Sequence, residues 1–426
     1  MLESALPRLN SLLGLLAMVL LAWALSTDRR KFPMRVVIGG LILQFVLALA
    51  VLRTIPGQWF FSQANLAVEG FQFFVSQGSG FVFGLFPDAN QHVAGDRTFL
   101  LKSFAFGVLP TVIVFSSLMS VLYHLGIMQL VVRGVALVMQ KTLGTSGPET
   151  LAAAANIFVG HTEAPLVVKP YLERMTRSEL NALMVGGFAT VTGSLIAGYA
   201  SMGVEAGHLI TASVISGPAA LLIAKLMVPE VDGDVVESTL AIESASESVN
   251  LVGAAAQGAS DGMKLALNIA AMLIAFLALI ALADFALGQA GALFGLVDMS
   301  GKPTLSFTML LGYAFAPVAW LIGVPWSESL DGGKLLGIKM VANEFVAYEQ
   351  LGEMLRREQP LSERTKTLMT YALCGFSNFS AIGIQIGGIG SLAPGRRNDI
   401  AQLGLRAMIG GTIACLMTAC IAGIIV

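Results

Sequence analysis

Charge is scarce in this chain of 426 residues. Asp, Glu, Lys and Arg make up only 12% of it, whereas hydrophobic residues make up 55%. Because a soluble domain carries about 25% charged residues, this composition excludes a water-soluble globule. The formal net charge is −2 and the chain has no basic tract of the kind that binds nucleic acid or anionic lipid, so nucleic acid is not an expected partner. The composition predicts an integral membrane protein surrounded by lipid.

Cysteines and nucleotide-binding motifs are also scarce. The three cysteines, Cys374, Cys415 and Cys420, lie in apolar segments and form no CxxC pair, which argues against a disulfide framework or a zinc site. The stretch GGIGS at 387–391 is too short for a dinucleotide fingerprint. Without a phosphate-binding loop, a nucleophile–base pair or a metal triad, the sequence predicts no enzyme, no ATP-driven pump and no organic cofactor. Ion-coupled or facilitated transport is the class of function that remains.

Long apolar runs dominate what is present. Transmembrane strands would alternate polar and apolar residues over about ten positions, and that pattern is missing. The predicted fold class is therefore an all-α integral membrane protein. Runs near the roughly 20 residues that cross a bilayer as a helix predict eight transmembrane helices, at about 11–25, 34–52, 98–123, 178–201, 208–228, 264–288, 336–355 and 402–425.

The first loop gives the orientation. It concentrates the basic residues Arg29, Arg30, Lys31 and Arg35, and the positive-inside rule places such a loop in the cytoplasm. Eight transmembrane helices then put both termini on the outer face of the cell (inner) membrane. Between the second and third of them, residues 59–77 mix aromatic and polar side chains at helical spacing, which favours a helix lying at the membrane interface.

Two apolar segments do not fit a simple transmembrane helix. Residues 151–172, LAAAANIFVGHTEAPLVVKPYL, and 308–330, TMLLGYAFAPVAWLIGVPWSESL, each turn at glycine, proline and polar residues about halfway along. We predict that both are re-entrant hairpins. Irregular backbone at membrane depth is tolerated where it is buried in protein or lines a watery cavity, so such hairpin tips mark a transport pathway.

A short internal similarity follows the two predicted hairpins. GFATVTGS occupies 187–194 and GFSNFSAI occupies 375–382, which aligns Thr190 with Asn378 and Thr192 with Ser380. A hairpin followed by an interrupted helix, present twice, is typical of secondary transporters built from inverted repeats. Close helix packing through small and polar residues is the alternative explanation of the similarity.

Two carboxylates lie deep in apolar surroundings, Glu163 and Glu344. An ionised side chain at that depth costs at least about 2.5 kcal/mol, so we expect each to face a cavity and to serve a function. The alternative for Glu344 is a pair with Lys339, although a spacing of five places the two on different helix faces. Amides and hydroxyls near the carboxylates suit a neutral polyhydroxylated solute or a monovalent cation.

The stretch GIKMVANEFVAY at 337–348 resembles the signature of the concentrative nucleoside transporters. That signature reads Gly-x-Lys-x-x-x-Asn-Glu-Phe-Val-Ala followed by an aromatic residue, and every fixed position is present. Further similarity runs from FGVLPTVIVFSSL near 106 through GHTEAPL to YALCGFSNFS near 371–380. The resemblance covers about three quarters of the chain.

The resemblance implies a homotrimer whose subunits move solute by an elevator motion. Transmembrane helices one to three and six would form a scaffold, and the hairpins with the other four would form a transport core. The implied divisions are a scaffold at 1–147, the first core repeat at 148–228, an acidic loop with the sixth transmembrane helix at 229–300, and the second core repeat at 301–426.

The resemblance also assigns the solute site. His161, Thr162 and Glu163 should face the base of a uridine-like nucleoside, and Glu344 with Asn378 should hold the ribose hydroxyls. The remaining assignments are Phe376 beside the ribose, and a sodium site formed by the side chains of Asn156 and Thr190 and the backbone carbonyls of Val191 and Leu195.

Two positions depart from the family pattern. His161 stands where the family usually has glutamine, which changes the hydrogen bonds available to the base. Ala381 stands where many members have serine, and Ser380 is the candidate substitute in the solute site. Two alternatives to sodium-coupled nucleoside import stay open: proton coupling with Glu163 or Glu344 as carrier, and transport of another polar solute on the same scaffold.

Overall fold

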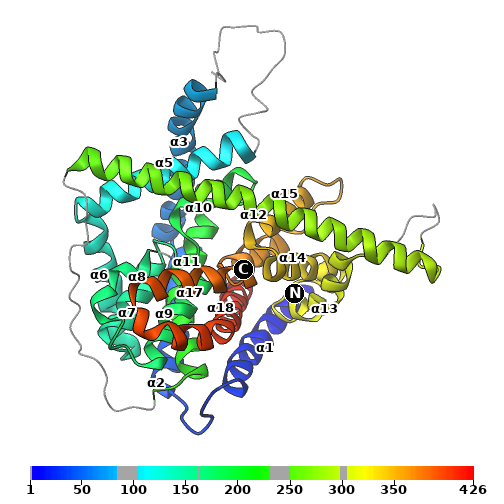
Figure 1. Ribbon diagram of the computed structural model, residues 1–426. Helices are drawn as coiled ribbons and strands as arrows, with labels where there is room; N and C mark the ends of the chain where they lie inside the picture. Colours follow the sequence, from blue (N-terminus) through cyan, green and yellow to red (C-terminus); the bar gives the residue numbers. More distant parts are fainter. Residues whose placement is uncertain (1, 84–103, 162, 231–249, 298–304) are drawn as a thin grey trace.

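The structure is a computed structural model that describes residues 2–83, 104–161, 163–230, 250–297 and 305–426. All regular elements in these ranges are helices (Figure 1). The predicted helical fold class is therefore confirmed. The acidic loop falls mostly outside the described residues, as do Thr162 and the first residues of the predicted span at 98–123.

Long apolar helices cross the molecule. Six in the described ranges are long and apolar enough to span a membrane. They comprise α1 (Leu2–Ala24), α2 (Met34–Arg53), α5 (Leu109–His124, continuing the π-helical turn Phe104–Val108), α11 (Ala206–Met227), α12 (Leu251–Leu293) and α18 (Arg397–Ile425). The helix predicted at 59–77 corresponds to α3, which is longer than expected and runs over Ile55–Phe83.

Two further helices are interrupted. The first consists of α9 (Arg177–Ala189) and α10 (Gly193–Ser201), and the second of α16 (Glu363–Leu373) and α17 (Phe379–Leu392). The similar segments 187–194 and 375–382 lie across the two breaks, as the sequence predicted. Together with the six long helices, these two interrupted helices make eight spans in the described ranges, which is the number that the sequence predicted. The individual assignment of 336–355 as a span was wrong, because the seventh span is α16 with α17.

The first hairpin lies where it was predicted. Its outward arm is α7 (Gly147–Asn156), and its short return arm holds α8 (Ala164–Val167) and the 3₁₀ turn Lys169–Tyr171. The hydroxyl of Ser146, at the start of the hairpin, donates to the Glu179 carboxylate just beyond its end. The two ends of the first hairpin therefore lie next to each other.

The second hairpin is displaced from its predicted position. Residues 308–330 were wrongly taken as a hairpin: α13 (Phe307–Leu321) is one helix that a turn joins to α14 (Ser329–Val341). The hairpin is formed by α14 and α15 (Glu344–Leu355), and an ion pair between Arg357 and Asp331 (3.7 Å) closes its base. Its tip at Ala342 and Asn343 holds neither glycine nor proline, so no helix-breaking residue identified it.

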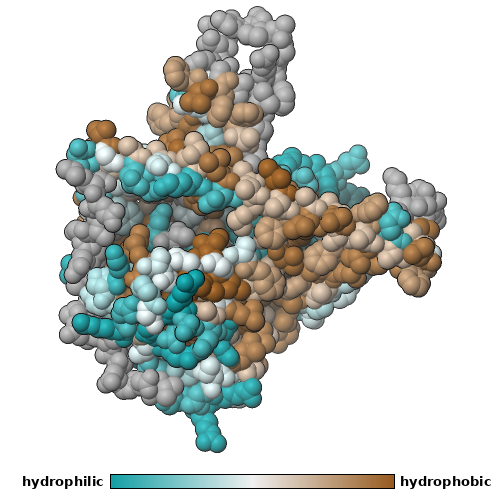
Figure 2. All heavy atoms as spheres, viewed as in Figure 1, coloured by the Kyte–Doolittle hydropathy of each residue, from teal (hydrophilic) through white to brown (hydrophobic). Residues whose placement is uncertain are grey.

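The elements occur in the same order twice. A span (α5 or α12), a linking helix (α6, Ile127–Leu143, or α13), a hairpin, an interrupted helix and a long helix (α11 or α18) follow one another in each half. Helices α11 and α18 are almost wholly buried, whereas most of α12 is exposed and apolar, as Figure 2 shows along the right of the molecule. The Arg8 guanidinium on α1 donates to the Val426 carbonyl (3.0 Å), so the first helix lies beside the C-terminus, and Figure 1 draws the two ends of the chain close together.

Candidate functional site

The two interrupted helices meet at a pair of glycines. A Cβ added to Gly187 would lie 2.6 Å from the Cβ of His161, and one added to Gly375 would lie 2.6 Å from the Phe188 carbonyl oxygen. Gly375 also has a φ of +131°, which disfavours other residues. These contacts bring the tip of the first hairpin and both helix breaks into one region.

Glu344 is the first residue of α15 and is only 4% exposed. Asn343 starts the helix, because its side chain accepts a hydrogen bond from the Val346 amide (3.0 Å). The Glu344 carboxylate accepts from the Tyr199 hydroxyl (3.1 Å) and from the Asn378 amide (3.1 Å). Neutral donors from two other helices therefore hold it.

Lys339 lies near enough to Glu344 to interact with it electrostatically, but it forms no ion pair with it. Its ammonium donates instead to the Ala372 carbonyl (2.9 Å). Among the described residues no cation lies within 4 Å of Glu344. Each carboxylate oxygen can accept more than one hydrogen bond, so the group has capacity left for hydroxyl groups of a ligand.

Asn378 caps the second half of its interrupted helix. Its side-chain oxygen accepts from the Ala381 amide (2.9 Å) and from the Ser380 hydroxyl (2.7 Å), while its nitrogen donates to Glu344. Ala381 is buried and brings no polar group. A hydroxyl that contacts the Asn378 side chain thus comes from Ser380, one residue before the position where many members of the family have serine.

The tip of the first hairpin packs against the same region. The rings of His161 and Phe376 meet edge to face with centroids 4.6 Å apart. His161 is 9% exposed, and neither ring nitrogen has a hydrogen-bond partner in the described part of the chain. Glu163 is exposed and lies near enough to Asp261 of α12 and Tyr123 of α5 to interact electrostatically with them.

The predicted ion ligands gather around the first break. Asn156 is fully buried, its side-chain nitrogen donates to the Leu183 carbonyl (3.4 Å), and its oxygen has no partner among the described residues. The Thr190 hydroxyl donates to the Gly186 carbonyl (2.9 Å), which leaves its lone pairs free for a cation. Val191 and Leu195 are buried beside it. Neutral oxygens of this kind suit a hard monovalent ion.

Two residues that the sequence did not single out complete the region. Tyr199 reaches Glu344 from α10, one helical turn after Leu195. Gln385, a lone amide in an apolar run, lies on α17 and donates to the Met184 carbonyl (3.2 Å). Tyrosine and glutamine at membrane depth were the available signals, but nothing in the sequence placed them near the hairpin tips.

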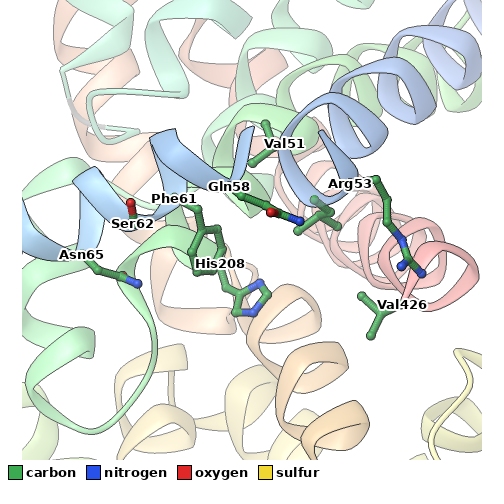
Figure 3. A pocket seen from close by; sticks show the side chains of 9 residues that line it. Val51, Arg53, Gln58, Phe61, Ser62, Asn65, His208 and Val426 are labelled. Atoms are coloured by element: carbon green, nitrogen blue, oxygen red, sulfur yellow. The ribbon is translucent and has the colours of Figure 1, made fainter. Parts of the chain in front are cut away.

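The molecule also has a cavity of about 430 Å³ away from these residues. It lies where the end of α2 approaches α3 and the start of α11, as Figure 3 shows. Its lining includes Arg53, Phe61, Asn65 and His208. None of the predicted solute or sodium residues contributes to it.

Comparison with known protein families matches almost the whole chain. Residues 208–423 match the model described as "Na+ dependent nucleoside transporter C-terminus", and residues 13–86 match the corresponding N-terminus. Residues 105–206 match a model described as "Nucleoside recognition".

Relatives are found in bacteria and mammals. An uncharacterised transporter of Haemophilus influenzae is 44% identical, and the match covers 98% of both chains. Sodium/nucleoside cotransporter 1 of Rattus norvegicus is 43% identical over 98% of this chain and 64% of its own length. The chain thus spans about 60% of the vertebrate relatives that it matches.

Solved structures agree in fold. CNTnw in an inward-facing substrate-bound state superposes with a TM-score of 0.89 at 42% identity, covering 98% of this chain and 97% of that one. A double variant of CNTnw in an outward-facing state also gives 0.89 at 42% identity and covers 98% of both chains. Both states share the architecture described above.

Proposed function

The chain belongs to the Na+-dependent nucleoside transporter family, and on that premise we propose that it imports nucleosides across the cytoplasmic membrane by symport with sodium. The observation that carries the proposal is the environment of Glu344. This buried carboxylate is held by Tyr199 and Asn378 and is not paired with Lys339. A carboxylate held in this way is suited to accept hydrogen bonds from adjacent hydroxyls, as a ribose presents them.

The base would lie toward the first hairpin. Phe376 offers an aromatic surface beside His161, and the two unpartnered nitrogens of His161 can donate or accept according to the tautomer. Thr162 and Glu163 would complete the base side. Ser380 would act through Asn378, since its hydroxyl donates to that residue's amide oxygen. Uridine is the substrate we propose first.

Sodium would bind at the first break. The unpartnered Asn156 oxygen, the Thr190 hydroxyl and the carbonyls of Val191 and Leu195 are the proposed ligands. Backbone carbonyls freed by unwinding coordinate coupling ions in transporters with broken helices. The ion and the solute would then share one mobile unit, because α10 carries both Leu195 and Tyr199.

Transport requires this unit to move against a scaffold. We assign residues 1–147 to the scaffold, together with residues 229–300, which hold the acidic loop and the sixth span. The moving core comprises residues 148–228 and 301–426. Glu163 at the hairpin tip approaches α5 and α12, which are scaffold helices in this division. The relatives solved in inward- and outward-facing states support an elevator motion. A homotrimer in the inner membrane with outward termini completes the proposal.

Uptake of labelled uridine into proteoliposomes tests the substrate assignment. The Glu344→Gln variant should lose uptake, whereas Glu353→Gln, at an exposed position on the same helix, should keep it. Competition by a panel of ribo- and deoxyribonucleosides should block uptake in the wild type. Failure of every nucleoside to compete would favour another polar solute.

A further inference from the structure

Gln385 is buried at the side of the proposed base site and has unused hydrogen-bonding capacity. It is 1% exposed, and its side-chain nitrogen donates to the Met184 carbonyl (3.2 Å). Its side-chain oxygen has no partner in the described part of the chain. A buried polar atom without a partner costs about 1–3 kcal/mol, so such atoms call for an explanation.

The contact with Met184 fixes the orientation of the amide. A carbonyl oxygen only accepts, so the NH₂ group of Gln385 must face Met184 on α9. Exchanging nitrogen and oxygen would set two acceptors against each other. The oxygen therefore points elsewhere, and it can only accept a hydrogen bond.

The position of Gly187 shows what lies beside that amide. A Cβ added there would lie 2.9 Å from the Gln385 nitrogen and 2.6 Å from the His161 Cβ. Both side chains therefore approach this glycine. His161 has two unpartnered ring nitrogens, so the imidazole of the hairpin tip and the side-chain amide of Gln385 on α17 lie around the same glycine.

Gln44 on α2 provides a contrast. It too is buried, its nitrogen donates to a backbone carbonyl (Gly40, 3.0 Å), and its oxygen has no partner among the described residues. An unpaired glutamine oxygen is thus not a ligand site by itself. What distinguishes Gln385 is the second unpartnered side chain beside it.

The helical register relates Gln385 to the ribose side. Asn378 caps α17, and Gln385 follows seven residues later, which places both on one buried face about 10 Å apart along the axis. One amide on this face contacts Glu344 and the other approaches His161. A solute with hydroxyls at one end and a polar heterocycle at the other matches that spacing.

We propose that Gln385 is a specificity-determining residue whose oxygen accepts a hydrogen bond from an N–H group on the edge of the base. The proposal rests on the proposed nucleoside transport function. In a uracil the donor would be N3–H, and in a cytosine it would be the exocyclic amino group. His161 supplies the neighbouring bond as donor or acceptor, while Gln385 demands a donor.

Binding of uridine and 3-methyluridine to the purified full-length protein tests this, because the methyl group removes the N3–H donor. Affinities are measured by calorimetry in sodium for the wild type, Gln385→Met and the matched control Gln44→Met. In Gln385→Met, uridine should bind roughly tenfold more weakly, while 3-methyluridine, which has no N3–H to lose, keeps its affinity. The preference for uridine over 3-methyluridine should therefore fall by the same factor, and the ratio of uridine to 2′-deoxyuridine affinity should stay constant.

Several results would overturn the role of Gln385. They are equal wild-type affinity for uridine and 3-methyluridine, an unchanged preference in Gln385→Met, an equal loss in Gln44→Met, or loss of all nucleoside binding by a monodisperse Gln385→Met protein. Equal wild-type affinity for the two nucleosides would reject the role of Gln385 even if the variant fails to fold. Absence of any nucleoside binding by the wild type would instead reject the proposed function.

Discussion

The Tyr199 hydroxyl donates a hydrogen bond to the Glu344 carboxylate across 3.1 Å, and thereby joins the first repeat to the second. Tyr199 is fully buried, and its ring lies 4.5 Å from that of Tyr348. The bond links α10, which follows the first helix break, to the tip of the second hairpin. A change at the first break can therefore reach the carboxylate that we assign to the ribose.

Tyr199→Phe should weaken uridine binding by about tenfold to a hundredfold, because a hydrogen bond to a charged group contributes about 1.5–3 kcal/mol. Tyr348→Phe is the matched control. Tyr348 is equally buried, but its hydroxyl donates to the Thr370 carbonyl (2.8 Å) and not to Glu344. Calorimetry with uridine in sodium measures both variants. Equal affinities for the two would contradict the role given to Tyr199.

Asn156→Ala should raise the sodium concentration that gives half-maximal uridine uptake by about tenfold or more, because the variant lacks one ligand of the ion. Asn181→Ala is its control, since Asn181 is also buried with an unpartnered side-chain oxygen but lies early in α9, away from the break. Uptake is measured over a sodium series at constant ionic strength. A similar shift in both variants would point to general packing instead of ion binding.

His161→Gln should change the order in which bases are preferred and leave the preference for ribose over deoxyribose intact. Glutamine offers a paired donor and acceptor where the imidazole offers one of each at most. Competition of labelled uridine uptake by cytidine, inosine and adenosine measures the order. An identical order in the wild type and the variant would remove His161 from the base side.

Gly375→Ala should destabilise the protein by about 1–3 kcal/mol, because alanine is strained at a φ of +131° and its Cβ would press on Phe188. Gly383→Ala on α17 is the control, since nothing lies within 4 Å of a Cβ added there. Thermal unfolding of the purified variants should show a lowered midpoint only for Gly375→Ala. An unchanged midpoint would mean that the break adapts to a side chain.

The sequence predicted the parts of this fold that leave local signals. Long apolar runs identified the long spans, and Gly160 with Pro165 identified the first hairpin. The second hairpin was misplaced because Gly323 and Pro325 mark a turn between α13 and α14, while the true tip is made by Ala342 and Asn343. Asparagine followed by an acidic residue is a helix-start signal that would have indicated this tip.

The site was predictable only in part, for a similar reason. Glu344 and Asn378 stood out as polar residues in apolar surroundings, and the structure joins them by a hydrogen bond. Tyr199 and Gln385 gain their positions from contacts between helices that are distant in the sequence. No local pattern encodes such contacts, so only the packed structure places them.

Concentrative uptake under an imposed sodium gradient tests whether nucleoside import is coupled to sodium. Proteoliposomes containing the wild-type protein are loaded without sodium and diluted into labelled uridine with either sodium or choline at fixed pH. Sodium coupling predicts that uridine accumulates above its external concentration in sodium and fails to do so in choline. Equal accumulation in both media would contradict sodium coupling, and accumulation driven by an inward proton gradient instead would assign the coupling to protons.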